Sequence, residues 1–483
     1  EEYVEYWNKR DFEDFTAFNI KFDFFYKTSS SENRQFVQDV FKKLERAGHI
    51  YENEIIQLYC NTDKKFLPDR YVVGTCPYCK ADDQYSDLCE KCGRVPEEIE
   101  NPHCAICGQT PVKKKTMHYF FKLKNFSDKI SQYLEDNKNL QKDVKKYVQN
   151  WIKEGLIDWD ITRDISWGIP IPTGGANEKV FYGWFDNHLA YISSTIKFLN
   201  DNGKDGKKFW NESDIYHFIG KDIVYHHYLF LPAIRLGIEE EYKLPDYIPT
   251  RGHLTLQSKK ISKSRNWYIG LKDFLAIFPA DYLRFYLISI NPYSQDDLNF
   301  NWGEFATKIN SELIGNLGNL VNRALGFTVK SFNGAVPGPD EFDDIDNESK
   351  KMINELVSHL GILMEENHLD RALKKILQFS AHFNQYFQHK EPWKNGPGTN
   401  TCVFLSVNAI RSLAIAVYPF LPESSQKIWL QLGLDGNVSA QMFDEISNIT
   451  LKQGHKLGSV SPLFEKVEES VIEEQKSKLG ASS

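Results

Sequence analysis

Apolar residues follow two different spacing patterns in two regions of the chain. From residue 159 to residue 270, short apolar runs alternate with helical stretches, as in an α/β sheet. After residue 302 the apolar positions step by three and four, as at Leu369, Leu373 and Ile376, which predicts amphipathic helices packed in a bundle. We therefore expect an α/β fold followed by an α-helical domain.

Local patterns predict the elements of the N-terminal third. Residues 23–26 are expected to form a short buried strand or turn, and residues 33–47 have apolar side chains at helical spacing. The basic, partly aromatic stretch 112–123 leads into a helical stretch that ends near Gly155. The cysteine-rich segment between these two helical stretches is expected to be an insertion.

Residues 215–222 combine a strand with a turn. Residues 215–219 are expected to form the strand, and Gly220 to Asp222 the turn, with Asp222 capping a helix that runs from Ile223 to about Leu236. Open α/β sheets bind ligands at the carboxyl ends of their strands, so this turn is a candidate binding site. An ordinary strand-to-helix turn is the alternative.

Composition and charge narrow the class of protein. The chain has 483 residues, 41% of them hydrophobic, which suggests about three domains. A net charge of −8 weakly disfavours nucleic acid as a partner, although basic residues gather at 113–115 and 259–265. The N-terminus lacks the pattern of a signal peptide, and the most apolar window, 402–421, contains an Asn, an Arg and a Pro. We expect a soluble cytoplasmic protein with no membrane partner.

Seven of the eight cysteines lie between residues 60 and 107, where six form three Cys-x2-Cys pairs. Two pairs have the spacing of zinc knuckles and predict one tetrahedral site, made of Cys76, Cys79, Cys89 and Cys92. A weaker second site would use a carboxylate in place of one thiolate, and comprises Cys60, Asp63, Cys104 and Cys107. A degenerate knuckle without metal is the alternative for this second set.

The run Lys260-Ile261-Ser262-Lys263-Ser264 is the candidate phosphate site. It interleaves two lysines with two hydroxyls just beyond the apolar strand 253–256. Two cations and two hydroxyls at this spacing could clamp a polyphosphate. A solvated loop is the alternative for the run taken alone.

The motifs together resemble one family. The lysine run resembles the lysine signature loop of class I aminoacyl-tRNA synthetases, and the chain from about residue 18 onwards resembles methionyl-tRNA synthetases of the archaeal type. The other motifs that carry the resemblance are Phe66-Leu-Pro-Asp-Arg70, Trp159-Asp-Ile-Thr-Arg163-Asp164, Tyr182-Gly-Trp184-Phe-Asp186, Phe218-Ile-Gly220-Lys-Asp222 and Glu391-Pro-Trp393. The resemblance implies ATP-dependent activation of methionine to methionyl-adenylate and transfer to tRNA(Met), with magnesium accompanying ATP and one or two zinc ions.

The resemblance also implies a domain order. We expect an incomplete class I Rossmann-like catalytic domain with a zinc-knuckle insertion, followed by an α-helical anticodon-binding bundle. The expected segments are 1–30 (remnant of the first catalytic half), 31–155 (connective insertion with the zinc knuckles), 156–250 (second catalytic half), 251–302 (lysine loop and stem-contact region) and 303–483 (anticodon-binding domain).

Individual roles follow from the matching positions. The resemblance implies that Lys260, Lys263 and Arg163 are catalytic. It assigns ATP binding to Gly220, Asp222, Lys260, Ser262, Lys263 and Ser264. It assigns the amino-acid pocket to Trp184, Asn187, His188, Tyr191, Ile223, His227 and Leu231. It assigns the reading of the CAU anticodon to Asn319, Arg323 and Trp393. A structural ion pair with Asp160 or Asp164 is the alternative for Arg163, and a bundle-capping aromatic is the alternative for Trp393.

The amino-acid pocket departs from the family. Asn187 and His188 stand where the family usually has small or apolar residues, and Leu231 where it commonly has tryptophan. A buried amide or imidazole without a partner would cost roughly 1 to 3 kcal/mol. The two side chains could instead turn outward, or pair with each other or with Asp186.

The His-x-Gly-His signature that class I synthetases pair with the lysine loop is missing, since no two of the thirteen histidines stand three apart. We therefore expect this chain alone to be inactive without the N-terminal half, which is removed, lies outside the sequence considered, or is supplied by another chain. Two other functions stay open: a catalytically silent tRNA-binding or regulatory homologue, and a synthetase-like enzyme with altered amino-acid specificity.

Overall fold

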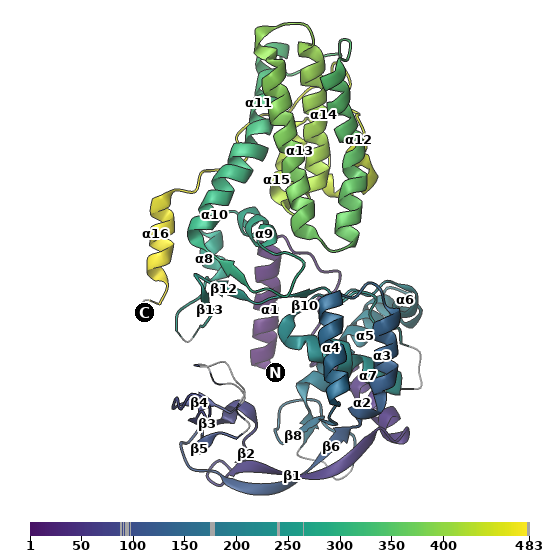
Figure 1. Cartoon of the computed structure of the whole chain (residues 1–483), viewed down its shortest axis with the longest axis vertical. Coiled ribbons are helices and arrows are strands. Elements are labelled where there is room, and N and C mark those ends of the chain that lie inside the picture. Colours follow the sequence, from purple (N-terminus) through teal and green to yellow (C-terminus); the bar gives the residue numbers. More distant parts are fainter. Residues whose placement is uncertain are drawn as a thin grey trace. The chain divides into compact units, whose positions relative to one another are not determined.

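The computed structural model describes residues 1–480 except 87–88, 90, 92–95, 97, 174–178, 239–241 and 264. The chain divides into two compact units, one formed by Asp23–Pro249 and the other by Glu1–Phe22 with Thr250–Ser483 (Figure 1). Each unit is described by itself. The finer domain boundaries expected from the sequence stay a prediction.

Of the first two elements predicted for the 23–249 unit, the structure confirms one and contradicts the other. Helix α2, Ser31–Arg46, is confirmed: the Ser30 hydroxyl caps it by accepting from Asn33 N at 3.1 Å, and Phe41 and Leu44 are fully buried. The strand or turn expected to be buried at residues 23–26 is wrong, because the segment is irregular and 37% of Phe24 is exposed. Phe24 stacks on Phe198 instead, with 5.5 Å between ring centroids.

A long antiparallel ribbon separates the cysteine-rich module from the rest of this unit. Strands β1, Ile50–Cys60, and β6, Val112–Phe121, pair along almost their whole length, and β2, Lys65–Phe66, and β7, Trp159–Asp160, flank them. The segment between β1 and β6 holds a separate small sheet of β4, Gln84–Tyr85, β3, Val72–Thr75, and β5, Glu100–Cys104, in that order. The chain thus leaves and returns through two paired strands, as expected of an insertion.

Helices and short strands complete the unit. They are η2, Leu123–Phe126, α3, Ser127–Asp136, α4, Lys142–Glu154, β8, Thr162–Arg163, β9, Val180–Phe181, α5, Gly183–Asp201, α6, Gly206–Glu212, and β10, Ile219–Gly220. Helix α4 ends as predicted at Gly155, whose φ of +101° favours glycine. The strand expected at 215–219 is shorter than predicted, with Tyr216 making only an isolated bridge to Tyr247.

The helix after β10 begins and continues differently from the prediction. Asp222 was expected to cap it, but Gly220 occupies the cap position and Asp222 lies inside a first 3-10 turn, η3, Lys221–Ile223. A π-helical segment follows, η4, His226–Phe230, before α7, Leu231–Gly237. The tertiary packing therefore overrides a simple α-helical periodicity, and π segments of this kind often mark functional sites.

The second unit begins with α1, Glu2–Ala17, a helix that the sequence analysis did not predict. After β11, Thr250–Arg251, it forms a three-stranded sheet in the order β13, Lys259–Lys260, β12, Leu254–Leu256, and β14, Leu298–Phe300. Strands β12 and β14 are parallel, and β12 and β13 form a hairpin. Helices α8, Leu271–Leu275, and α9, Ala280–Ser289, lie between β13 and β14 in the sequence.

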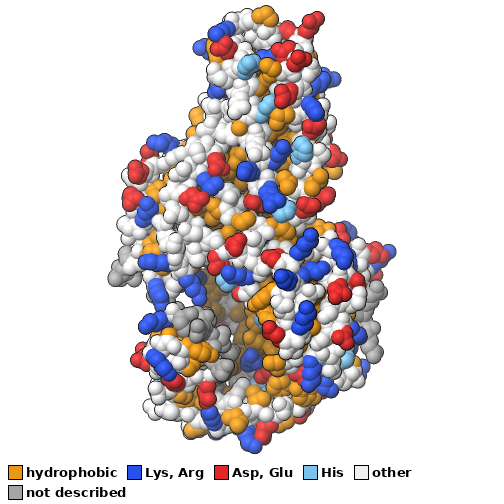
Figure 2. Space-filling view, in the orientation of Figure 1, with side chains coloured by type: hydrophobic (Ala, Val, Ile, Leu, Met, Phe, Trp, Pro, Cys, Tyr) orange, Lys and Arg blue, Asp and Glu red, His pale blue; other side chains and the backbone are white. Residues whose placement is uncertain are grey.

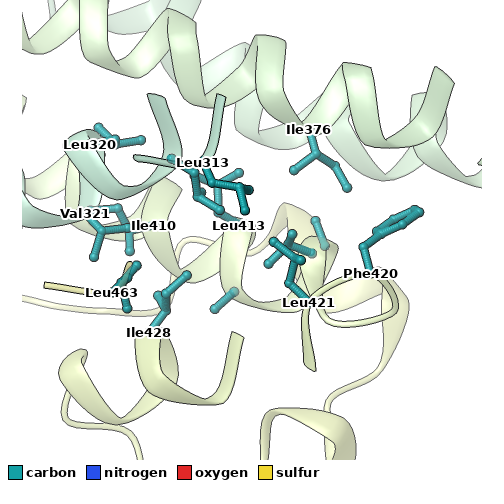
Figure 3. Packing of buried hydrophobic residues seen from close by; sticks show 14 of the residues in the cluster. Leu313, Leu320, Val321, Ile376, Ile410, Leu413, Phe420, Leu421, Ile428 and Leu463 are labelled. Atoms are coloured by element: carbon teal, nitrogen blue, oxygen red, sulfur yellow. The ribbon is translucent and has the colours of Figure 1, made fainter. Parts of the chain in front are cut away.

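The predicted bundle is present in the same unit, where its long helices lie lengthwise side by side (Figure 1). Its elements are α10, Trp302–Lys308, the π segment η5, Ile309–Gly318, α11, Asn319–Phe332, α12, Asp344–Glu365, α13, Leu369–Lys390, η6, Pro392–Lys394, α14, Thr399–Val417, α15, Pro422–Gln431, η7, Val438–Ala440, η8, Phe443–Ser447, and α16, Glu469–Lys478. Figure 3 shows Leu313, Ile376 and Leu413 meeting in its core. The loop that follows α11 ends where Asp343 caps α12.

The apolar window 402–421 forms most of α14, as expected for a bundle helix. Thr399–Val417 is the one helix among the described residues that is long and apolar enough to cross a membrane, and 89% of its most apolar window is buried inside the fold. Acidic and basic side chains are interspersed over the face shown in Figure 2. That face therefore presents a mixed charge pattern in place of a single-signed field.

Candidate functional site

The lysine loop is an exposed hairpin extension. Gln257 and Ser258 turn the chain from β12 to β13 with φ values of 49° and 61°, and Lys260 ends β13 with an exposed side chain. Ser262 and Trp267 then exchange two backbone hydrogen bonds of 2.9 Å, which closes a second tight turn around Lys263. Both lysines are solvent-exposed on a short, hydrogen-bonded scaffold; Ser264 lies outside the described residues.

Gly220 and Asp222 are held together at the start of η3. A Cβ atom at position 220 would lie 2.5 Å from Asp222 Oδ1, so the carboxylate folds back over the glycine. The φ of Gly220 is −83°, which any residue can adopt. A side chain at position 220 would therefore have to displace the Asp222 carboxylate from its present position.

Helix α5 and the π segment η4 bring most of the predicted amino-acid pocket together. The Tyr191 hydroxyl lies 3.2 Å from His227 Nε2, and His227 Nδ1 lies 3.0 Å from the Ile223 carbonyl oxygen. On the other side Trp184 stacks on His226, with ring centroids 4.2 Å apart and an interplanar angle of 12°. The sequence analysis missed His226; its position one residue before His227 was the only signal.

His188 is buried and Asn187 is exposed, so the two side chains neither pair with each other nor both point outward. Asn187 is exposed, whereas His188 is fully buried between α5 and η4 and neither ring nitrogen has a hydrogen-bond partner. Its ring lies 4.9 Å from that of His227, centroid to centroid. Leu231 is also fully buried. The pocket region thus contains an imidazole with unused donor and acceptor capacity.

Burial keeps the histidines of this region neutral. It lowers the pKa of His226 and of His227 to about 4, and lowers the pKa of His188 and His217 well below the ordinary value. A cavity of about 360 Å³ lies beside Tyr191 and His217. Neutral aromatic and imidazole side chains at neutral pH suit a substrate side chain without charge.

Burial also raises the pKa of the Asp186 carboxyl to about 7, and its Oδ1 atom has no hydrogen-bond partner. The carboxyl accepts hydrogen bonds from the backbone N–H groups of Asp186 and Asn187, and the structure shows no hydrogen bond from it to the side chain of Asn187 or His188.

Arg163 lies in a network of charged groups. Its Nη1 atom donates to the Thr162 carbonyl oxygen at 2.7 Å and lies 3.5 Å from Asp160 Oδ2, and its guanidinium carbon is 3.7 Å from the centre of the Tyr182 ring. The structural ion pair considered as an alternative is thus present with Asp160. It fixes the direction of the guanidinium and leaves Arg163 partly accessible.

In the cysteine-rich module, the described members of each predicted metal site lie close to one another. Sulfur atoms of Cys76, Cys79 and Cys89 all lie within 4.8 Å of one another, and the predicted fourth ligand, Cys92, lies outside the described residues. Distances of this size suit thiolates around one tetrahedral zinc ion.

The second set is complete. Its four ligand atoms also lie within 4.8 Å of one another, and Asp63 Oδ2 is 3.2 Å from Cys60 Sγ and 3.1 Å from Cys104 Sγ. Hydrogen bonds from the three thiols, that of Cys107 first, lower the pKa of Asp63. The carboxylate therefore occupies the fourth corner of the cluster, as the spacing predicted.

The predicted anticodon residues lie on neighbouring elements of the bundle. The Arg323 guanidinium carbon is 5.9 Å from the centre of the Trp393 ring, and 42% of Trp393 is exposed. Asn319 Nδ2 donates to Asn384 Oδ1 at 2.7 Å, and Arg323 Nη2 donates to Gln388 Oε1 at 2.9 Å. Asn384 and Gln388 were missed by the sequence analysis, although they stand four apart on α13.

Lys390 secures the end of α13 just before Trp393. Its ammonium lies 2.7 Å from carboxylate oxygens of both Asp343 and Asp346, and the Tyr386 hydroxyl donates to Asp346 at 2.6 Å. The bond from Lys390 lowers the pKa of Asp343 to about 2. The chain then turns at Glu391, whose φ is 42°, so Trp393 projects from a tightly held corner.

Two family models match the chain. One, described as tRNA synthetases class I (M), matches residues 1–325; the other, described as the anticodon binding domain of methionyl tRNA ligase, matches residues 336–483.

Similar curated proteins include the methionine–tRNA ligase of Methanopyrus kandleri, 40% identical over all of this chain and 73% of the relative, and that of Pyrococcus furiosus, 39% identical over 95% of this chain and 65% of the relative. The chain thus spans about two thirds to three quarters of the length of these relatives.

Solved structures have the same fold. The Mycobacterium tuberculosis methionyl-tRNA synthetase bound by methionyl-adenylate matches with a TM-score of 0.76 at 23% identity, covering 94% of this chain and 85% of that one; its apo form matches with a TM-score of 0.76 at 22% identity, covering 96% and 88%. The α/β catalytic fold followed by a helical anticodon domain is thereby confirmed. Taken with the family models, this shows that the chain belongs to the methionyl-tRNA synthetase family.

Proposed function

We propose that the protein of which this chain is part activates methionine with ATP to methionyl-adenylate and transfers the methionyl group to tRNA(Met). The observation that supports this proposal is the co-occurrence of a hydrogen-bonded lysine loop, the Gly220–Asp222 turn and the bundle corner at Trp393 in a chain of this family. Its 40% identity to a methionine–tRNA ligase supports the same reaction.

The chemistry is an in-line displacement. The carboxylate of the amino acid attacks the α-phosphorus of ATP, a bond forms between a carboxylate oxygen and that phosphorus, and pyrophosphate leaves with the electron pair of the broken phosphoanhydride P–O bond. Such a displacement needs positioning and stabilisation of charge and no covalent nucleophile. Magnesium would accompany the ATP phosphates.

Residues of this chain would position the two substrates and stabilise the developing charge. Lys260 and Lys263 neutralise the charge that develops on the pyrophosphate. Asp222 accepts hydrogen bonds from the ribose hydroxyls, with Gly220 allowing close approach. Arg163, already oriented by Asp160 and Tyr182, pairs with the amino-acid carboxylate. The neutral ring-lined region of Trp184, Tyr191 and His227 receives the uncharged thioether side chain.

The bundle is proposed to read the anticodon. Trp393 offers an exposed ring for a base to stack upon, and Asn319 and Arg323 offer amide and guanidinium groups to base edges. The two cysteine sets fit zinc by donor chemistry and spacing, and would hold the small β3–β4–β5 module rigid. An enzyme of translation works in the cytoplasm, which is the location we propose.

This reaction also needs the His-x-Gly-His signature, and no two histidines of this sequence stand three apart. We propose that this signature is contributed by a further segment of the same polypeptide or by a second chain. Assays of the reaction therefore use the protein with its complete catalytic domain.

The test is methionine-dependent exchange of pyrophosphate into ATP, followed by aminoacylation of tRNA(Met). Lys263→Ala is expected to slow the exchange while leaving tRNA affinity intact, and Trp393→Ala to weaken tRNA binding while leaving exchange intact. Lys351→Ala, at an exposed position on α12, is the control and should change neither. Exchange that shows no preference for methionine over the other amino acids would refute the proposal. It would favour an enzyme with altered amino-acid specificity, which the unpartnered His188 in the pocket region suggests. No exchange at all from the complete protein would favour a silent homologue.

A further inference from the structure

His118 on strand β6 lies between two carboxylates and is fully buried. Its Nδ1 atom is 2.7 Å from Asp160 Oδ2 and its Nε2 atom is 2.7 Å from Asp164 Oδ2. An ionised carboxylate can only accept hydrogen bonds, so both contacts are hydrogen bonds only if both ring nitrogens carry a proton. The geometry is therefore that of an imidazolium held by two aspartates.

The charges around His118 support this state. Asp164 also accepts a hydrogen bond from Lys179, and Asp160 lies 3.5 Å from Arg163. Across the ribbon, the residue of β1 that pairs with His118 is the neutral Asn53. Burial alone would lower the pKa of His118, but the hydrogen bonds that His118 donates to Asp160 and Asp164 outweigh it and raise this pKa above the ordinary value.

The network leads directly to Arg163. Asp160 Oδ1 also accepts from the backbone N–H of Thr162 at 3.1 Å, which ties the aspartate to the backbone beside the arginine. Oδ2 of the same carboxylate faces both His118 and Arg163. The same guanidinium lies over the Tyr182 ring, with its carbon 3.7 Å from the ring centre.

We propose that His118 is a positioning residue: its imidazolium ties Asp160 to Asp164 and thereby holds Arg163 in the direction that binds the carboxylate of the amino acid. The inference deepens the proposed function and rests on it. It assigns His118 no contact with substrate, and it gives the β1–β6 ribbon a part in the adenylation step besides carrying the metal module.

Loss of the proton would undo the arrangement. A neutral imidazole donates one hydrogen bond only, and its second nitrogen would then direct a lone pair at a carboxylate oxygen 2.7 Å away. One aspartate must then move, and with Asp160 the Arg163 side chain moves too. Because the pKa of folded His118 is raised, the arrangement is present at low and neutral pH and is lost as the pH rises through that raised value.

The test compares the complete enzyme with its His118→Gln variant by methionine-dependent pyrophosphate exchange from about pH 6 to about pH 9. In the wild type, KM for methionine should rise at the alkaline end while KM for ATP changes little. In His118→Gln, KM for methionine should be raised about tenfold at every pH, without the alkaline rise. Met117→Gln, on the exposed opposite face of β6, is the control and should behave as the wild type.

A second measurement does not depend on the variant folding. The nitrogen NMR signals of His118 in the wild type should show both ring nitrogens protonated at neutral pH. A neutral His118 at pH 7, or a His118→Gln enzyme with unchanged methionine KM and an unchanged pH profile, would overturn the inference. Absence of exchange in the wild-type enzyme would instead overturn the proposed function, because His118 is intact there.

Discussion

Replacing His226 with phenylalanine should make the fold more resistant to acid. His226 lies in η4 with its ring stacked on Trp184, 4.2 Å between centroids, and 5.0 Å from the ring of Trp159. Its Nδ1 atom is buried without a hydrogen-bond partner. Phenylalanine keeps a flat ring between the two tryptophans and removes the titrating group.

The size of the effect follows from the pKa of His226, which burial lowers from 6.5 to about 4. A group with a depressed pKa binds fewer protons in the folded state than in the unfolded state, so folding is penalised as the pH falls below the unfolded value. At pH 7.5 the penalty is close to zero, and at pH 5 it reaches about 2 kcal/mol. Between pH 7.5 and pH 5, the free energy of unfolding of the wild type should therefore fall by about 2 kcal/mol more than that of His226→Phe.

The assay is urea unfolding of both proteins at pH 7.5 and pH 5, followed by tryptophan fluorescence, which Trp159 and Trp184 make sensitive to this region. Only the difference between the two proteins is used, because other groups titrate in the same range; the raised pKa of Asp186, for example, favours the folded state at lower pH. His359→Phe, at an exposed position in α12, controls for the loss of a histidine. If wild type and His226→Phe lost equal stability between the two pH values, the assignment of a depressed pKa to His226 would be wrong.

Three further outcomes are expected. Gly220→Ala should raise KM for ATP about tenfold, since its Cβ would lie 2.5 Å from Asp222 Oδ1 and displace the carboxylate; an unchanged KM in exchange assays would contradict the role of Asp222. Gln388→Ala should weaken tRNA(Met) binding by up to about tenfold through loss of the 2.9 Å bond that orients Arg323, with no change in methionine activation, as measured by filter binding. The purified protein should contain two zinc ions per chain, and Asp63→Asn should retain one, by elemental analysis; one zinc ion in the wild type would argue against the second site, and two in Asp63→Asn would argue against Asp63 as a ligand.

The parts predicted best from the sequence are those set by short spacing rules. Two ligand residues three positions apart can reach one metal whatever surrounds them, so the Cys60–Asp63 and Cys104–Cys107 pairs were recognised and they do converge. The same holds for α13, where apolar residues at steps of three and four leave one buried face. In both cases the spacing of residues along the chain is enough to predict which side chains converge or are buried.

Features that depend on tertiary packing were not predictable in this way. The sequence allowed His188 to point either outward or inward, and only the packing of α5 against η4 buries it without a partner. Asp222 has the chemistry of a capping residue, yet Gly220, two residues earlier, occupies the cap position. Phe24 looked like a core residue but packs at the surface on Phe198.

The π segment η4 has a consequence for how this site can change. An α-helix places successive residues about 100° apart, and a π turn accommodates one residue more than an α turn. Removing one residue from 226–230 would therefore restore a regular helix and leave the parts on either side close to their present phase, while changing which side chains the segment itself presents. His226 faces Trp184 and His227 faces Tyr191 only because this extra residue is tolerated. A single-residue deletion here is thus expected to keep the surrounding helix and to lose the contacts of the two histidines, whereas point substitutions can reshape the site with the segment intact.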